Sequence, residues 1–219
     1  IDEFQQIGTF PEKNIEALLR THVQRCHNAQ FIFAGSQRHT MSAMFMNASR
    51  PFYQSVSIMH LDSIPMDKYD AFAKSLFAEG SRTLADGVTE AVYAISNGVT
   101  WYSQKLFNTL YAATAAGTSC TRENVQEALD YTVKTQSYGY EEILVRLPEK
   151  QKNVLIALSK NGPTKSVTSA TFVEKYNLLS ASSVQSAIRG LLDKDFITLE
   201  QGIYSVYDHF MAYWLRTTH

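Results

Sequence analysis

Two polar groups near the start of the chain have the residue types that phosphate-transfer chemistry requires. Asp2 and Glu3 directly follow an apolar residue. An acid pair at the end of an apolar strand can divide this work, because one carboxylate binds Mg²⁺ and the other orients the attacking water. The alternative interpretation is a pair of solvated loop acids.

Ser36 is the second polar group. Residues 31–34 are an apolar run that predicts a buried strand, and Gly35 and Ser36 follow it. Because ligands of parallel sheets bind at the carboxyl edge, we expect Ser36 to lie beside the acid pair. Its hydroxyl would hydrogen-bond a phosphate oxygen or the attacking water. The alternative is a turn serine after a turn glycine.

These groups lie in a segment, residues 1–61, that reads as part of an α/β domain. A helix is predicted after Pro11, and a second strand is predicted from Val56 to Leu61. Apolar strands alternating with helices indicate a parallel sheet. Two strands are too few for a stable sheet, and the chain has no initiator Met, so we expect a piece of a longer protein.

Residues 62–147 predict a helical bundle. The expected helices lie near residues 67–79, 84–97, 100–116, 121–137 and 139–147. Residues 148–219 predict three helices, then strands at residues 196–199 and 203–206, and a closing helix capped by Asp208. This is the element order of a winged helix.

Composition excludes several classes of protein. The 219 residues have a net charge of -1, with no apolar run long enough to cross a bilayer and no signal peptide. Two cysteines are too few for a disulfide framework and fit a reducing compartment. We therefore expect a cytoplasmic protein without membrane contact.

DNA binding by the winged helix is weighed against a role in regulation or protein contact. Gln185 and Arg189 on its third helix are residue types that read base edges. However, residues 148–219 carry only eight basic against six acidic side chains, and the hairpin tip begins with Glu200. Phosphate contacts dominate DNA affinity, so the sequence favours an intramolecular or protein contact.

Several motifs resemble archaeal and bacterial ATPases of the AAA+/STAND class. Ile1-Asp2-Glu3-Phe4-Gln5 resembles the end of a Walker B strand, and residues 31–36 resemble the sensor 1 strand. Ser49-Arg50-Pro51-Phe52-Tyr53 resembles the stretch before the last core strand. Residues 182–187 and 206–216 resemble the C-terminal winged helix of that class.

The resemblance implies a mixed α/β and mostly α protein. Residues 1–61 would be the C-terminal part of a P-loop NTPase α/β core, residues 62–147 a helical lid, and residues 148–219 the winged helix. It also implies that Asp2 binds Mg²⁺, Glu3 is the catalytic base, Ser36 is the sensor and Arg50 is a phosphate-sensing cation.

One departure from that class limits what this chain does alone. No G-x-x-x-x-G-K followed by Ser or Thr occurs, so the cradle for the β- and γ-phosphates is absent. ATP and Mg²⁺ are therefore expected to bind in an intact parent protein, and the chain alone is expected to be inactive. The alternatives are a DNA-binding regulator with a vestigial ATPase core, and a toxin–antitoxin or signalling scaffold without turnover.

Overall fold

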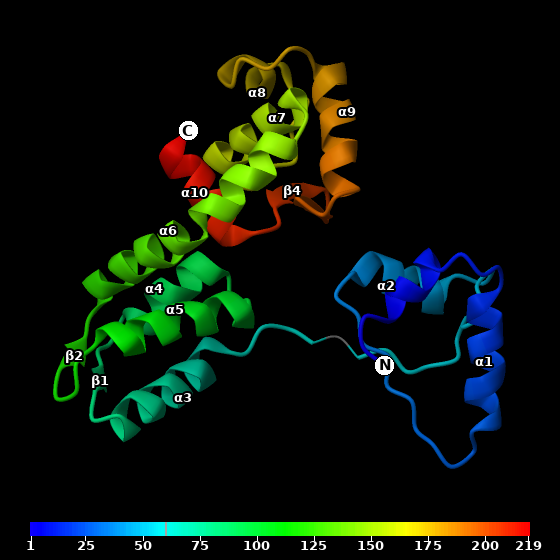
Figure 1. Cartoon of the computed structure of the whole chain (residues 1–219), viewed down its shortest axis with the longest axis horizontal. Coiled ribbons are helices and arrows are strands. Elements are labelled where there is room, and N and C mark those ends of the chain that lie inside the picture. The colour runs from blue at the N-terminus through cyan, green and yellow to red at the C-terminus, as the bar shows by residue number, and fades with distance from the viewer. Residues whose placement is uncertain (60) are drawn as a thin grey trace. The chain divides into compact units, whose positions relative to one another are not determined.

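The computed structural model describes residues 1–59 and 61–219, with only the main chain described at residues 38 and 39. The chain divides into two compact units, Ile1–Asp62 and Ser63–His219 (Figure 1). It is mostly helical with a few short strands, as predicted. Among the described residues, no helix combines the length and hydropathy that crossing a bilayer requires.

The first unit packs its helices around phenylalanine rings. Its helices are the 3-10 helix η1 (Phe4–Thr9), α1 (Ile15–Arg25) and α2 (Arg38–Met46). The core is formed by Phe4, Ile7, Met44, Phe45 and Phe52. The rings of Phe4 and Phe33 have centroids 4.3 Å apart, which brings residues 31–34 against η1. Such a ring pair contributes about 0.5–1.5 kcal/mol beyond area burial.

The start of the chain runs beside residues 32–34 as a parallel strand would. The Ile1 amino group donates to the Ile32 carbonyl at 2.7 Å, and the Ala34 N–H donates to the Ile1 carbonyl at 2.8 Å. In a parallel ladder, one residue bonds to the two residues that flank its partner. Ile1 is therefore paired with Phe33, and the Phe4 N–H extends the pairing to the Ala34 carbonyl at 2.9 Å.

The predicted strands at residues 31–34 and 56–61 are wrong for the residues that the structure describes. Neither stretch forms a strand there; His60, in the second stretch, lies outside the described residues. The side chains of Ile32, Met59 and Leu61 are about four-fifths exposed, at 81%, 82% and 80%. A strand needs hydrogen-bonded neighbours along its length, and the pairing at Ile1 covers a single residue.

The second unit begins with four helices that pack against one another. They are α3 (Met66–Glu79), α4 (Val88–Ser96), α5 (Thr100–Ala113) and α6 (Arg122–Arg146). The predicted break at residues 137–139 is wrong, because α6 continues through Gly139. A helical glycine costs about 1 kcal/mol, whereas burying Tyr140 and Leu144 contributes about 1.5–3 kcal/mol each. Packing therefore outweighs the local propensity.

A short parallel strand pair joins two loops of this helical segment. β1 (Thr83–Leu84) pairs with β2 (Ser119–Cys120), so that Leu84 lies opposite Cys120. Both of these side chains are buried. The sequence predicts helices alone here, because a strand of two residues is too short to show alternating hydrophobicity.

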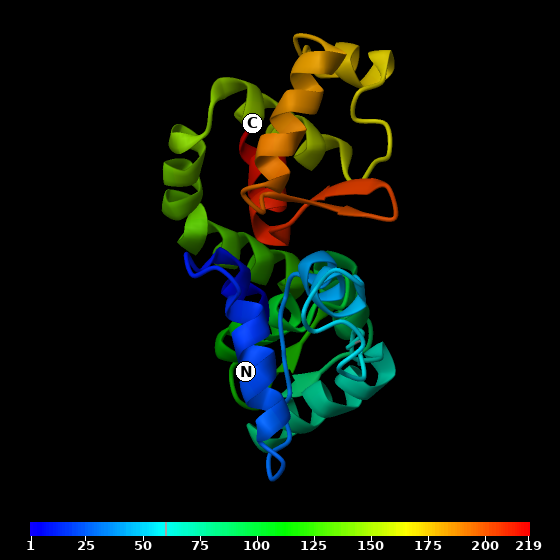
Figure 2. The same cartoon turned by 90° about the vertical axis from the view of Figure 1, so that its right-hand side faces the viewer.

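The C-terminal segment has the predicted winged-helix order. Its elements are α7 (Glu149–Asn161), α8 (Ala170–Lys175), α9 (Ala181–Leu192), β3 (Ile197–Glu200), β4 (Ile203–Val206) and α10 (His209–Thr218). The hairpin lies beside the end of α9 (Figure 2). Gln201 and Gly202 have φ angles of 51° and 80°, as a type I′ turn requires. Thr164 also bridges to Tyr204 and widens the sheet.

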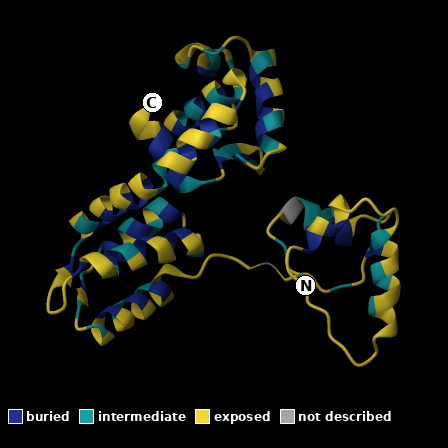
Figure 3. Cartoon of the chain, viewed as in Figure 1, coloured by how far each residue is buried: buried dark blue, intermediate teal, exposed yellow. Residues whose placement is uncertain are grey.

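The helical and winged-helix segments share one hydrophobic core within the second unit. Buried residues line the helix faces that meet one another (Figure 3). α10 packs against both α6 and α7. The Trp214 ring of α10 lies 5.5 Å from the Tyr140 ring of α6, measured between centroids. The winged helix is thus anchored on the helices that precede it.

Candidate functional site

The acid pair lies at the start of the first unit, where the chain enters η1. Asp2 and Glu3 are both exposed to solvent. Glu3 has a φ of 47° and a ψ of 43°, a left-handed conformation that costs a non-glycine residue about 1–2 kcal/mol. The Glu3 N–H donates to the Asp2 Oδ1 at 2.9 Å. The chain thus bends at Glu3 immediately before η1, and both acids remain accessible to solvent.

Ser36 and Gln5 converge on the Glu3 carboxylate. The Ser36 hydroxyl lies 3.2 Å from each of the two Glu3 carboxylate oxygens, and the Gln5 Nε2 donates to the Glu3 Oε2. Ser36 reaches this position because the pairing of Ile1 with Phe33 brings residue 36 alongside residue 3. The structure therefore brings Glu3 and Ser36 together, although the expected strands do not form.

Gln5 is a member of this cluster that sequence analysis did not select. It is only 4% exposed, and its Oε1 has no hydrogen-bond partner among the described residues. A Cβ on Gly35 would lie 2.2 Å from that oxygen, so glycine at this position makes room for the Gln5 amide. The sequence carries no signal for this role, because the burial of Gln5 follows from the packing of η1 against Gly35.

Arg50 lies in a different set of contacts. Its guanidinium forms an ion pair with the Glu16 carboxylate of α1, and Glu16 is buried. Among the described residues, Arg50 forms no hydrogen bond or ion pair with Asp2, Glu3 or Ser36. In this structure Arg50 therefore joins α1 to the loop after α2.

The acid cluster fits one part of a Mg²⁺ shell. Among the described residues, no three His, Cys, Asp or Glu side chains gather in a way that could hold a metal ion. Mg²⁺ is, however, held in phosphate-transfer sites by one or two carboxylates together with water and phosphate oxygens. Asp2 is exposed and its Oδ1 accepts from the adjacent Glu3 N–H, so its carboxylate can supply one such ligand.

The chemistry that this arrangement permits is activation of a water molecule by Glu3, beside the carboxylate of Asp2. The Glu3 carboxylate can accept a proton from water, while two neutral donors hold its orientation. Of the two donors, Gln5 is buried and Ser36 is exposed, and Glu3 itself is open to solvent.

Comparisons with known proteins agree with the C-terminal architecture. Residues 138–217 match a family described as a probable winged helix domain. No curated protein sequence matches the chain. A Walker-type ATPase of Pyrococcus abyssi has a similar structure, with a TM-score of 0.64 and 15% sequence identity; the match covers 98% of this chain and 61% of that chain. At this identity the likeness concerns the fold: the chain contains a winged-helix domain and folds like part of a Walker-type ATPase.

Proposed function

We propose that this chain is the C-terminal part of an AAA+/STAND-type P-loop ATPase that acts in the cytoplasm. The observation that carries the proposal is the Glu3–Ser36 contact, at 3.2 Å, between two segments that pair in parallel. A Walker B acid and a sensor residue would have this relation at the edge of a nucleotide-binding sheet. The likeness in fold to a Walker-type ATPase supports the same assignment.

In this proposal each site residue has a separate role. Asp2 supplies a ligand to the Mg²⁺ that accompanies ATP, and Glu3 is the base that orients the attacking water. Ser36 senses the γ-phosphate, because its hydroxyl already lies beside Glu3. Arg50 senses phosphate only if its ion pair with Glu16 opens, which makes it a conditional member of the site.

The phosphate cradle must come from an intact parent protein, because no P-loop occurs in these residues. In the parent, Glu3→Gln should slow ATP hydrolysis by about 10² to 10⁴-fold, the range of general base catalysis, while ATP binding stays nearly unchanged. Asp2→Asn should weaken Mg²⁺-dependent ATP binding. Parental hydrolysis rates in both variants would show that the acids are ordinary loop residues.

A DNA-binding regulator with a vestigial core is the second candidate, favoured by one feature of the winged helix. Gln185, Ser186 and Arg189 are exposed along α9. Against it, Glu200 at the wing is acidic, so we rank a protein or intramolecular contact first. Fluorescence anisotropy with duplex DNA decides between them, since regulation by contact predicts only non-specific affinity, about 10⁻⁴ to 10⁻⁶ M. Nanomolar, sequence-dependent binding that Arg189→Glu abolishes would reverse the ranking.

A further inference from the structure

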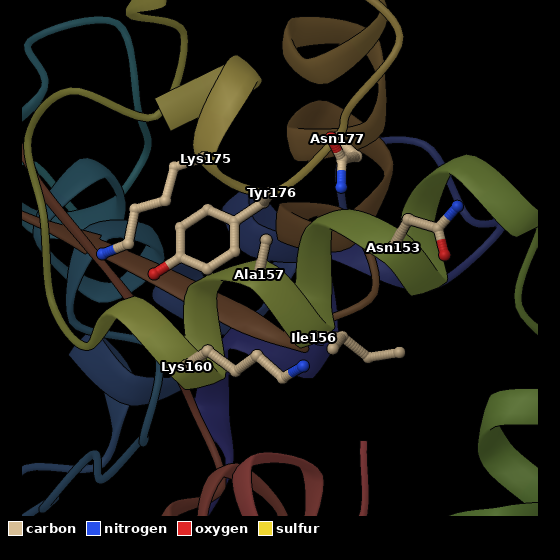
Figure 4. Close-up of a pocket in the computed structure, with 7 residues that line it drawn as sticks. All are labelled: Asn153, Ile156, Ala157, Lys160, Lys175, Tyr176 and Asn177. Atoms are coloured by element: carbon tan, nitrogen blue, oxygen red, sulfur yellow. The ribbon is translucent and has the colours of Figure 1, made fainter. Parts of the chain in front are cut away.

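A shallow pocket of about 370 Å³ lies between α7 and the end of α8 (Figure 4). Its two cations are engaged elsewhere. The Lys160 Nζ donates to the main-chain oxygen of His219 at 2.6 Å. The Lys175 Nζ lies 4.9 Å from the centroid of the Tyr176 ring. The two ammonium groups therefore do not converge on a ligand, and a helix face elsewhere in the second unit is the stronger candidate for binding.

That face belongs to α6, which carries an apolar stripe exposed to solvent (Figure 3). Tyr131, Tyr138 and Val145 are spaced seven residues apart and are 65%, 73% and 84% exposed. Seven residues make almost two helical turns, so the three side chains lie on one line, about 10.5 Å from one to the next. By contrast, Tyr140 of the same helix is buried and packs on Trp214. The stripe therefore adds little to the core of the second unit.

Charged side chains flank this stripe, and their sign reverses at Tyr138. Lys134 lies four residues before Tyr138, and Glu141 and Glu142 lie three and four residues after it. All three are exposed, and Glu142 forms an ion pair with Arg146 at 3.6 Å. Among the described residues, neither the Lys134 ammonium nor the Glu141 carboxylate forms an ion pair. One positive and one negative charge are therefore available on either side of the centre of the stripe.

We propose that this stripe binds a second copy of the chain through antiparallel pairing of two α6 helices. A two-fold axis at Tyr138 places Tyr131 against Val145 of the second copy, because both residues lie seven positions from the axis. The same symmetry places Lys134 beside Glu141 of the second copy. One contact thus covers the apolar residues and pairs the charges. The proposal goes beyond the ATPase assignment, because it uses none of the residues of that site.

Charge favours this orientation and this occupant. In a parallel pair, Lys134 would face Lys134 of the second copy and Glu141 would face Glu141, and such like-charge contacts are unfavourable. In the antiparallel pair, opposite charges meet, and the symmetry makes each contact occur twice. A partner surface of a single charge sign would leave either the lysine or the glutamate unpaired. A self-complementary surface therefore fits a second copy best.

The size of the stripe predicts a weak dimer. An aromatic side chain presents about 150–250 Å², so the four partly exposed tyrosine rings of a dimer offer roughly 550 Å². With Val145 and the stems of the flanking side chains, the interface stays below about 1,200 Å², the range of transient contacts. We therefore expect a dissociation constant of about 10 to 100 μM, weaker than that of interfaces of standard size.

Sedimentation equilibrium of the whole 219-residue chain, from about 5 to 500 μM, tests the proposal. The wild-type chain should pass from monomer to dimer over this range. Tyr138→Glu should weaken dimerisation more than about tenfold, because two negative charges then meet at the two-fold axis. Phe72→Glu is the matched control, since Phe72 is 53% exposed on α3, outside the stripe. A wild-type chain that stays monomeric, or equal losses in the two variants, would overturn the proposal.

Charge-reversal variants test the antiparallel pairing. Lys134→Glu and Glu141→Lys should each weaken dimerisation about tenfold, because each replaces two attractive contacts with repulsive ones. Mixed in equal amounts, the two variants should associate as tightly as the wild type, since one contact then joins two native charges and the other joins two reversed charges. Lys68→Glu on α3 controls for net charge and should leave dimerisation unchanged. No recovery in the mixture would overturn the pairing, and tryptophan fluorescence verifies that each variant is folded.

Discussion

Replacing Asp208 should loosen the winged helix from the helices that precede it. The Asp208 Oδ1 caps α10, because it accepts from the Phe210 N–H at 2.9 Å and the Met211 N–H at 3.1 Å. The same carboxylate accepts from the Tyr102 hydroxyl of α5 at 3.5 Å and the Tyr140 hydroxyl of α6 at 3.3 Å. One half-buried side chain therefore connects α5, α6 and α10.

The size of the effect follows from these contacts. Losing the cap costs about 1 kcal/mol. Losing a hydrogen bond to a charged group costs about 1.5–3 kcal/mol. The low end of this range is expected for Asp208, because both of its hydrogen bonds from tyrosine hydroxyls are long. Each hydroxyl also has a second acceptor, the Tyr207 carbonyl at 3.4 Å or the Gln136 Oε1 at 2.9 Å. We therefore expect Asp208→Ala to lower the free energy of unfolding by about 2 to 3 kcal/mol.

Tryptophan fluorescence during urea or thermal unfolding measures this change. Trp101 and Trp214 are the two tryptophans of the chain, and both lie in the second unit, so the signal reports that unit. The melting temperature should fall by about 4 to 12 °C. Asp208→Asn is the matched control: asparagine caps as well as aspartate, so the loss should stay below about 1 kcal/mol.

A double-mutant cycle separates the cap from the connection to α6. Asp208→Ala combined with Tyr140→Phe should show a coupling free energy of about 0.5 kcal/mol or more, as expected for residues in contact. A loss below about 0.5 kcal/mol for Asp208→Ala alone, the range of an unconnected surface substitution, would refute the reasoning.

Three further predictions follow from the described contacts. Burial lowers the pKa of His209 despite the nearby Asp208 charge, so the unfolded chain takes up the proton first as pH falls below about 6.5. Unfolding free energy should then decrease by up to about 1.4 kcal/mol per pH unit in that window, and His209→Phe should flatten the slope. Gly35→Ala should cost the first unit about 1–3 kcal/mol and displace Gln5 from Glu3, seen as a shift of the Gln5 side-chain amide signal. The chain alone should show no micromolar Mg-ATP binding by calorimetry, because it has no P-loop; a clear isotherm would place a nucleotide site elsewhere.

Local signals in the sequence determined most of the second unit. The hairpin turn at Gln201 and Gly202 and the cap at Asp208 are settled by residues within a few positions of each other. The helices α7 and α9 were likewise predicted from apolar residues that recur three and four positions apart. These features could be predicted because each is stabilised by contacts that the local sequence already contains.

Tertiary structure alone decided the arrangement of the first unit and of the candidate site. The sequence predicted that Ser36 lies beside the acid pair, but it predicted complete strands there. The structure instead brings Ser36 to Glu3 through the short pairing of Ile1 with Phe33, a contact across more than thirty residues that no local pattern contains. Gln5 reads as an ordinary polar residue until η1 buries it against Gly35. The ion pair of Arg50 with Glu16 joins residues 34 positions apart, so residue spacing did not indicate it, and a role of Arg50 in sensing phosphate stays a prediction. Contacts between distant segments depend on how the chain packs as a whole, and residue spacing does not encode them.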